Sequence, residues 1–218
     1  MARDHLFTSR RALLGIFAAA PAAALAPWGA ALGQLHESYG DEPAVLRRTK
    51  AGRALSRARY HNAEGFFAGI EAGFPFRRKD ILYQAGIVAQ LALSAHLLDV
   101  GFPDAWCVRH IGLRVGKSLA YANATGLAHD CFDMARLAAI LTPYWKWNRT
   151  RWDEPEPDDG DFTARQVRPL LRALLDRVHD VTGHPRPRGW ARRSREGGKA
   201  YRIESRTGYR GLSAEVVR

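Results

Sequence analysis

Histidine, aspartate and cysteine side chains recur in the middle of this chain in an order that suits metal binding. His129 and Asp130 are adjacent within a segment of helical periodicity. Neutral imidazole and carboxylate together can hold a divalent metal, which activates a water molecule for hydrolysis. Further ligands would come from an upstream histidine (His96 or His110) and a downstream aspartate (Asp176 or Asp180). This order predicts a catalytic pair at His129 and Asp130.

The ligand order resembles that of the HD-type helical metal phosphohydrolases. The resemblance rests on the His129-Asp130 dipeptide and implies a divalent metal and phosphohydrolase activity. The chain departs from the family at Cys131-Phe132, where an apolar residue and a glycine usually follow. Because the chain has 8 His and 13 Asp among 218 residues, one such dipeptide arises easily by chance and is weak evidence for an enzyme.

Two cysteines extend the set of metal-binding candidates. Cys107 and His110 are three residues apart and share a helix face, whereas His129 and Cys131 are two apart and do so only where a helix begins. Two cysteines are too few for a disulfide scaffold, so the apolar core must hold the fold. Three interpretations stay open for Cys107 and Cys131: core thiols, one disulfide, or a site of two Cys and two His with metal.

The run "GLRVGKS", Gly112 to Ser118, has the residue types of a phosphate-binding loop. That loop needs four residues between its first glycine and Gly-Lys-Ser, and a strand before it. Here three residues intervene within a helical pattern, so the sequence argues against a nucleotide site.

An aromatic patch is predicted at "YWKWNRTRW", where Lys146, Arg149 and Arg151 alternate with large rings. Such interleaving suits stacking on bases, sugars or aromatic ligands, or a membrane interface. The plainer interpretation is that the rings close the end of a helical bundle. The members of the patch are Tyr144, Trp145, Trp147 and Trp152.

Apolar runs of helical period, separated by Pro, Gly and polar breakers, predict an all-α fold for residues 34–183. After a polar linker over 34–43, a first helix is expected to start near Asp41 and Pro43. The chain is then expected to form a single irregular bundle of about five helices. The expected helical segments are 44–60, 63–74, 81–100 capped by Asp80, 105–124, 127–145 with Phe132 inward, and 167–181 after a Thr163–Gln166 capping box.

The segment 81–100 is apolar on nearly every face. A helix of this kind lies either in the middle of a bundle or in a membrane. Gln84, Gln90, Ser94 and His96 interrupt it, which favours the bundle. The short connection "GFPD" predicts that segments 81–100 and 105–124 are antiparallel neighbours.

The first 33 residues have the layout of a secretory leader. Arg10 and Arg11 precede a run without Asp, Glu, Lys or Arg that extends from Ala12 to His36. The motif resembles the bacterial twin-arginine leader, which routes folded proteins through the export machinery; its residues here are Ser9, Arg10, Arg11, Leu13 and Leu14. Small residues at 31–33 predict cleavage before Gln34, and 24–26 is the rival site. The alternative is an N-terminal helix of a cytoplasmic protein.

The net charge of +11 is concentrated at the C-terminus. Residues 1–33 carry +2, residues 34–183 carry +2 and residues 184–218 carry +7. The segment 184–218 lacks apolar periodicity and predicts a basic, poorly ordered tail, which suits nucleic acid or anionic lipid.

No motif identifies a reaction, so three functions stay open. The leading expectation is a non-enzymatic interaction or accessory module of the bacterial envelope, exported by the twin-arginine route and acting on an unknown protein partner. The second is a cytoplasmic nucleic-acid-associated protein that uses the basic tail. The third is the metal-dependent hydrolase at His129 and Asp130.

Overall fold

The computed structural model describes residues 28–73, 77–142, 144 and 158–187. Within these ranges the chain is helical and contains no strand, which confirms the all-α class. The described ranges contain seven α-helices and one π-helical turn, whereas about five helices were expected. They are α2 (Gly29–Tyr39), α3 (Lys50–Glu71), α4 (Arg78–Val100), α5 (Asp104–Trp106), η2 (Cys107–Ile111), α6 (Val115–Ala124), α7 (Phe132–Leu141) and α8 (Ala164–Thr182).

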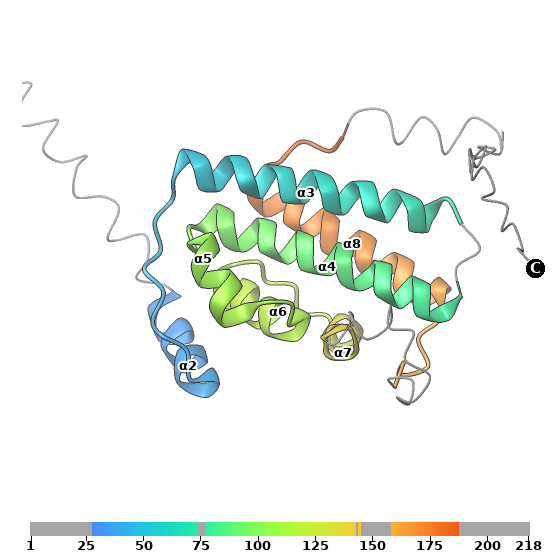
Figure 1. The fold of residues 1–218 in the computed structure, drawn as a ribbon, viewed down its shortest axis with the longest axis horizontal. Coiled ribbons are helices and arrows are strands. Elements are labelled where there is room, and N and C mark those ends of the chain that lie inside the picture. Colours follow the sequence, from blue (N-terminus) through green and yellow to red (C-terminus); the bar gives the residue numbers. More distant parts are fainter. Residues whose placement is uncertain (1–27, 74–76, 143, 145–157, 188–218) are drawn as a thin grey trace, which may run out of the picture. The chain divides into compact units, whose positions relative to one another are not determined.

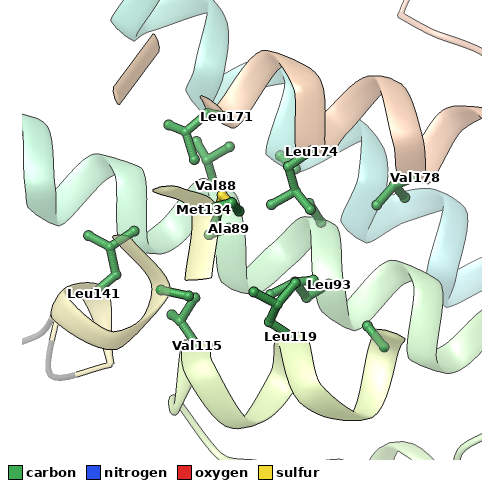
Figure 2. Packing of buried hydrophobic residues seen from close by; sticks show 14 of the residues in the cluster. Val88, Ala89, Leu93, Val115, Leu119, Met134, Leu141, Leu171, Leu174 and Val178 are labelled. Carbon is green, nitrogen blue, oxygen red and sulfur yellow. The ribbon is translucent and has the colours of Figure 1, made fainter. Parts of the chain in front are cut away.

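The α4 helix is the centre of the fold (Figure 1). It contacts α3, α6, α7 and α8, while α2 packs on α6 at one end. Its apolar side chains meet those of three neighbours in the core (Figure 2). The residues labelled there are Val88, Ala89 and Leu93 of α4, Val115 and Leu119 of α6, Met134 and Leu141 of α7, and Leu171, Leu174 and Val178 of α8.

By length and composition, α4 is the one helix among the described residues that is apolar enough to cross a membrane. The fold buries 67% of its most apolar window, however. The expectation that segment 81–100 lies inside a bundle is therefore confirmed.

The α8 helix also follows the sequence closely. Thr163 and Gln166 form the expected capping box, and Gly183 ends the helix in the left-handed region at φ +67°. The residues at helical spacing that point into the core are Val167, Leu171, Leu174, Leu175 and Val178. Arg172 of α8 also forms two hydrogen bonds, 2.6 and 2.9 Å long, to the buried carboxylate of Glu64 in α3.

The beginning of the described chain differs from expectation. The predicted polar linker over 34–43 is wrong for its first part, because α2 runs from Gly29 to Tyr39. Leu32 and His36, four residues apart, are buried on one face of α2 and give it a packed side. Segment 41–49 has no helix, so the helix start predicted at Asp41 and Pro43 is also wrong.

The two helices predicted over 44–60 and 63–74 form one continuous helix, α3. Thr49 starts α3, its hydroxyl oxygen accepting a hydrogen bond of 2.9 Å from the Gly52 N–H, and the helix continues unbroken to Glu71. Tyr60 and Ala63, the residues on each side of the predicted gap, are both fully buried. Continuous packing across the gap explains why the helix does not break there.

Two other segments contain fewer helical residues than predicted. Gly112, at φ +59°, separates η2 from α6 within the expected helix 105–124. The expected helix over 127–145 begins only at Phe132, whose side chain is 78% exposed rather than inward. Asp80 does not cap α4 from outside; it lies in the first turn and accepts a hydrogen bond from the Arg77 N–H.

Candidate functional site

The residues predicted to bind metal do not converge. Within the part of the chain that the structure describes, no three His, Cys, Asp or Glu side chains come together as a metal site. Asp130 is exposed beside α7, and Asp176 pairs with Arg172 and Arg186. His96 is buried in α4, where its Nε2 lies 3.3 Å from Thr125 Oγ1.

His129 is placed by its backbone rather than by a ligand set. Its N–H donates to Asn123 Oδ1 over 3.0 Å. Burial, with the nearby charge of Arg177, lowers the pKa of His129 below its usual range. His129 Nε2 is buried and has no hydrogen-bond partner among the described residues. The imidazole is therefore neutral, but no second and third ligand stand with it.

The two cysteines are free thiols, and the structure shows no disulfide between them. Cys107 lies in η2, whereas Cys131 directly precedes α7. Burial raises the pKa of the Cys107 thiol to about 12, which keeps it protonated at neutral pH. Because His110 pairs with Asp41, the predicted site of two Cys and two His is not assembled.

Of the predicted aromatic patch, Tyr144 is described and is buried against Gly86 of α4, with its ring 6.1 Å from that of Tyr83. Trp145, Trp147 and Trp152 lie outside the described residues, as do the leader motif and the tail beyond residue 187. The Tyr144 position agrees with a ring that closes the bundle.

A pocket of about 660 Å³ lies beside α4, and we call it the α4 pocket. Residues from α3, α4, η2 with its following turn, and α6 form its walls, together with Tyr144. The volume and the mainly apolar walls are those of a small-molecule site. The lining residues are Arg59, Asn62 and Phe66 of α3; Ile87, Gln90, Leu91, Ser94 and Leu97 of α4; Cys107, Val108, Ile111, Gly112 and Leu113; Ser118 of α6; and Tyr144.

Three of these residues expose large apolar side chains. Phe66 is 43% exposed, Val108 65% and Leu113 48%. They come from α3, from η2 and from the turn after it, so the edge of the pocket joins apolar groups from different elements. Exposed apolar groups gathered around a pocket mark a place where another apolar group binds.

The π-helical turn η2 fixes one wall of the α4 pocket. The Gly112 N–H donates to the Cys107 carbonyl, and Gln90 Nε2 of α4 donates over 3.0 Å to the Gly112 carbonyl. The wide turn thus presents Val108 on the pocket side and is tied to α4. Short π-helical turns are frequent at functional sites.

The polar groups of the pocket are few. Arg59 is its one charged lining residue, and the guanidinium donates to Ser94 Oγ and, over 2.6 Å, to Asp104 Oδ1. Gln90 Oε1 and Ser118 Oγ are buried and have no hydrogen-bond partner among the described residues. The walls therefore suit an apolar ligand that carries a hydrogen-bonding group.

A second group of polar residues joins α2 to the rest of the fold. Lys117 Nζ lies 2.6 Å from Asp41 Oδ2, and Tyr121 donates to the same carboxylate. His110 Nδ1 lies 3.5 Å from Asp41 Oδ1, and the His36 ring packs against Tyr121. We call these five residues the Asp41 cluster.

The charges in the Asp41 cluster are satisfied within it. Burial opposes ionisation of Asp41, but hydrogen bonds from Lys117 and Tyr121 outweigh it and hold the pKa of the carboxyl below its usual range. Burial lowers the pKa of His36, which keeps the imidazole neutral. The lysine of the "GKS" motif, Lys117, is thus engaged with Asp41.

Sequence reasoning did not identify either site. Two signals were available: the apolar residues Val108 and Leu113 in a segment that also contains Arg109, His110 and Arg114, and a lysine among the apolar residues of α6. Comparison of the chain with protein-family models, curated proteins and solved structures finds no match.

Proposed function

We propose that this chain is a non-enzymatic binding module of the bacterial envelope that holds a small apolar ligand in the α4 pocket. The observation that carries the proposal is the apolar edge formed by Phe66, Val108 and Leu113 around a pocket of about 660 Å³. The ligand has an apolar body and one hydrogen-bonding group, for which Gln90 and Ser118 offer unused capacity.

Export by the twin-arginine route completes the proposal. Its support is the motif at residues 9–14, which precedes the described part of the chain. Cleavage before Gln34 would cut α2 and remove the buried Leu32, whereas cleavage after Ala26 would leave α2 whole. Because peptidases cut exposed, unstructured chain, a cut inside α2 is disfavoured, and we propose the rival site at 24–26 instead.

Titration with 11-(dansylamino)undecanoic acid, whose fluorescence rises in apolar surroundings, tests the pocket. We expect saturable binding by the full chain. Val108→Asp places a charge on the apolar edge, and we expect it to weaken binding by about tenfold or more. Because Val108 is exposed, we expect the substitution to leave the fold intact.

Val45→Asp is the matched control, because Val45 is 80% exposed and lies outside the α4 pocket. We expect it to bind the probe as the unchanged protein does. Equal losses in the two variants, or no saturable binding by the unchanged protein, would contradict the proposal.

A further inference from the structure

The segment 43–63 carries six basic residues and no acidic residue. Two of the six have carboxylate partners: Arg53 Nη1 lies 2.9 Å from Asp99 Oδ1, and Arg59 Nη2 lies 2.6 Å from Asp104 Oδ1. The other four are exposed and have no carboxylate partner within the described ranges. We call these four the basic stripe: Arg47, Arg48, Lys50 and Arg57.

The fold places the basic stripe along one edge of α3. Lys50 and Arg57 are seven residues apart and therefore share a helix face. Arg47 and Arg48 immediately precede the helix, and the Arg47 N–H donates over 2.8 Å to the carbonyl of Gly101. This contact attaches the segment to the end of α4, so the four cations are held by structured backbone rather than by a free loop.

The surface next to the basic stripe is made of small apolar residues. Ala51, Ala54 and Ala58 are exposed on α3. On the far side of these alanines, Leu55 is 37% exposed and Phe66 43% exposed. The opposite face of α3 packs against α4 and α8.

This distribution shares two features with helices that lie in the interface of a membrane: cations on one side and exposed apolar residues beside them. Such helices combine basic side chains on one side with apolar residues that enter the boundary between headgroups and acyl chains. Each cation near an anionic leaflet adds to the attraction. A nucleic-acid surface would instead combine cations with several aromatic side chains for stacking. No aromatic residue lies between Arg47 and Arg57, and Phe66 is the one exposed Phe, Tyr or Trp side chain of α3.

We propose that α3 docks this protein on an anionic phospholipid surface through the basic stripe and the adjacent alanines. The proposal concerns the outer face of α3 and does not require a ligand in the α4 pocket. It also does not involve the basic tail, so the experiment must distinguish lipid binding by the stripe from lipid binding by the tail.

Flotation with phospholipid vesicles tests the proposal on the full chain. We expect binding to vesicles with 30% phosphatidylglycerol and little binding to pure phosphatidylcholine. The double variant Lys50→Glu/Arg57→Glu reverses two charges of the stripe and keeps the tail. We expect its partition coefficient onto anionic vesicles to fall by at least about tenfold.

The control is Lys79→Glu/Arg165→Glu, which changes the net charge equally but in the first turns of α4 and α8. Those turns lie at the end of the bundle away from the start of α3 (Figure 1). We expect this variant to retain most of its binding. Circular dichroism of both variants checks that the helices are intact.

Equal losses in the two double variants would overturn the proposal, because net charge or the tail would then account for binding. An unchanged affinity of Lys50→Glu/Arg57→Glu for anionic vesicles would overturn it as well. A parallel titration with a labelled 20-base-pair DNA supplies a further criterion. Loss of DNA binding in the stripe variant, with vesicle binding retained, would assign the stripe to nucleic acid instead.

Discussion

Lys117 Nζ lies 2.6 Å from Asp41 Oδ2, and the two side chains are only 3% and 6% exposed. The pair joins the segment that follows α2 to the face of α6. Tyr121 donates to the same carboxylate over 2.6 Å, so both Asp41 oxygens have partners. A buried ion pair of this kind is strongly destabilised when one partner is removed, because the other charge is left without compensation.

We expect Lys117→Met to lower the free energy of unfolding by about 3–5 kcal/mol. Urea unfolding at neutral pH measures the change. The double variant Asp41→Asn/Lys117→Met removes both charges and should be more stable than Lys117→Met alone. A single variant as stable as the unchanged protein would show that the pair does not hold α2 in place.

Stability should fall as the pH decreases from 6.5 to 4, in part because of His96. Burial lowers the pKa of His96 from 6.5 to about 4. In this window the unfolded chain binds a proton at His96 and the folded chain does not, so acid favours unfolding. The stabilisation is complete above pH 6.5, and a shift of this size corresponds to about 3 kcal/mol.

The measurement is urea unfolding at several pH values, compared between the unchanged protein and His96→Gln. The variant keeps a polar side chain near Thr125 but cannot titrate, so its stability should vary less between pH 6.5 and 4. His36, His129 and His184 also have lowered pKa values and remain in both proteins. Identical pH dependence in the two proteins would contradict the assignment to His96.

Asp41 and Glu64 affect the stability of the fold at lower pH than His96 does. Hydrogen bonds from Lys117 to Asp41 and from Arg172 to Glu64 outweigh burial and lower the pKa of each carboxyl. Their contribution is present above the unfolded values of 3.8 and 4.5 and is lost as the pH falls through the lower folded values. The acid-sensitive range of these two carboxyls therefore lies mostly below that of His96 and meets it near pH 4.

Gly86 of α4 is required for the approach of Tyr144. A Cβ atom added at Gly86 would lie 2.3 Å from Tyr144 Cβ and Cγ, which the packed ring cannot accept without moving. We expect Gly86→Ala to lower the free energy of unfolding by about 1–3 kcal/mol.

Gly65→Ala is the matched control in thermal or urea unfolding. Gly65 lies within α3, and no other atom lies within 4 Å of an added Cβ. Alanine is favoured over glycine in a helix, so this variant should gain about 0.5–1 kcal/mol. A loss of stability in both variants would mean that the Tyr144 contact is not the cause.

The proposed export makes a prediction about location. We expect the unchanged protein to be recovered from the periplasm in a shortened form, and Arg10→Lys/Arg11→Lys to accumulate at full length in the cytosol. N-terminal sequencing of fractionated cells distinguishes a start at Pro27 from one at Gln34. An intact Met1 form of the unchanged protein in the cytosol would count against export.

The sequence predicted those parts of the fold in which local signals agree with burial. The run over 81–100 is apolar on nearly every face, and the four polar residues that interrupt it favour the centre of a bundle over a membrane; α4 lies there. The Thr163–Gln166 capping box, the apolar residues after it and Gly183 all indicate one helix, which α8 confirms. These signals depend on residues close in sequence, and no distant contact opposes them.

Helix bounds and side-chain burial that depend on packing between distant segments could not be predicted from the sequence. The polar composition of residues 34–43 predicted a linker, yet Leu32 and His36 bury one face of α2. Phe132 is apolar and predicted to be inward, but it begins α7 and faces solvent. In both cases, whether a side chain is buried or exposed depends on a neighbour from a distant part of the chain.

The candidate sites show the same division. Composition and spacing determined the helical class and the separation of a basic tail segment from a nearly neutral body. Only the tertiary structure brought Asp41 to Lys117 and gathered Phe66, Val108 and Leu113 around one pocket. It also left the metal-ligand candidates of the described residues without a common site. Helical periodicity specifies which residues share a face of one helix, whereas the packing of helices determines which faces meet.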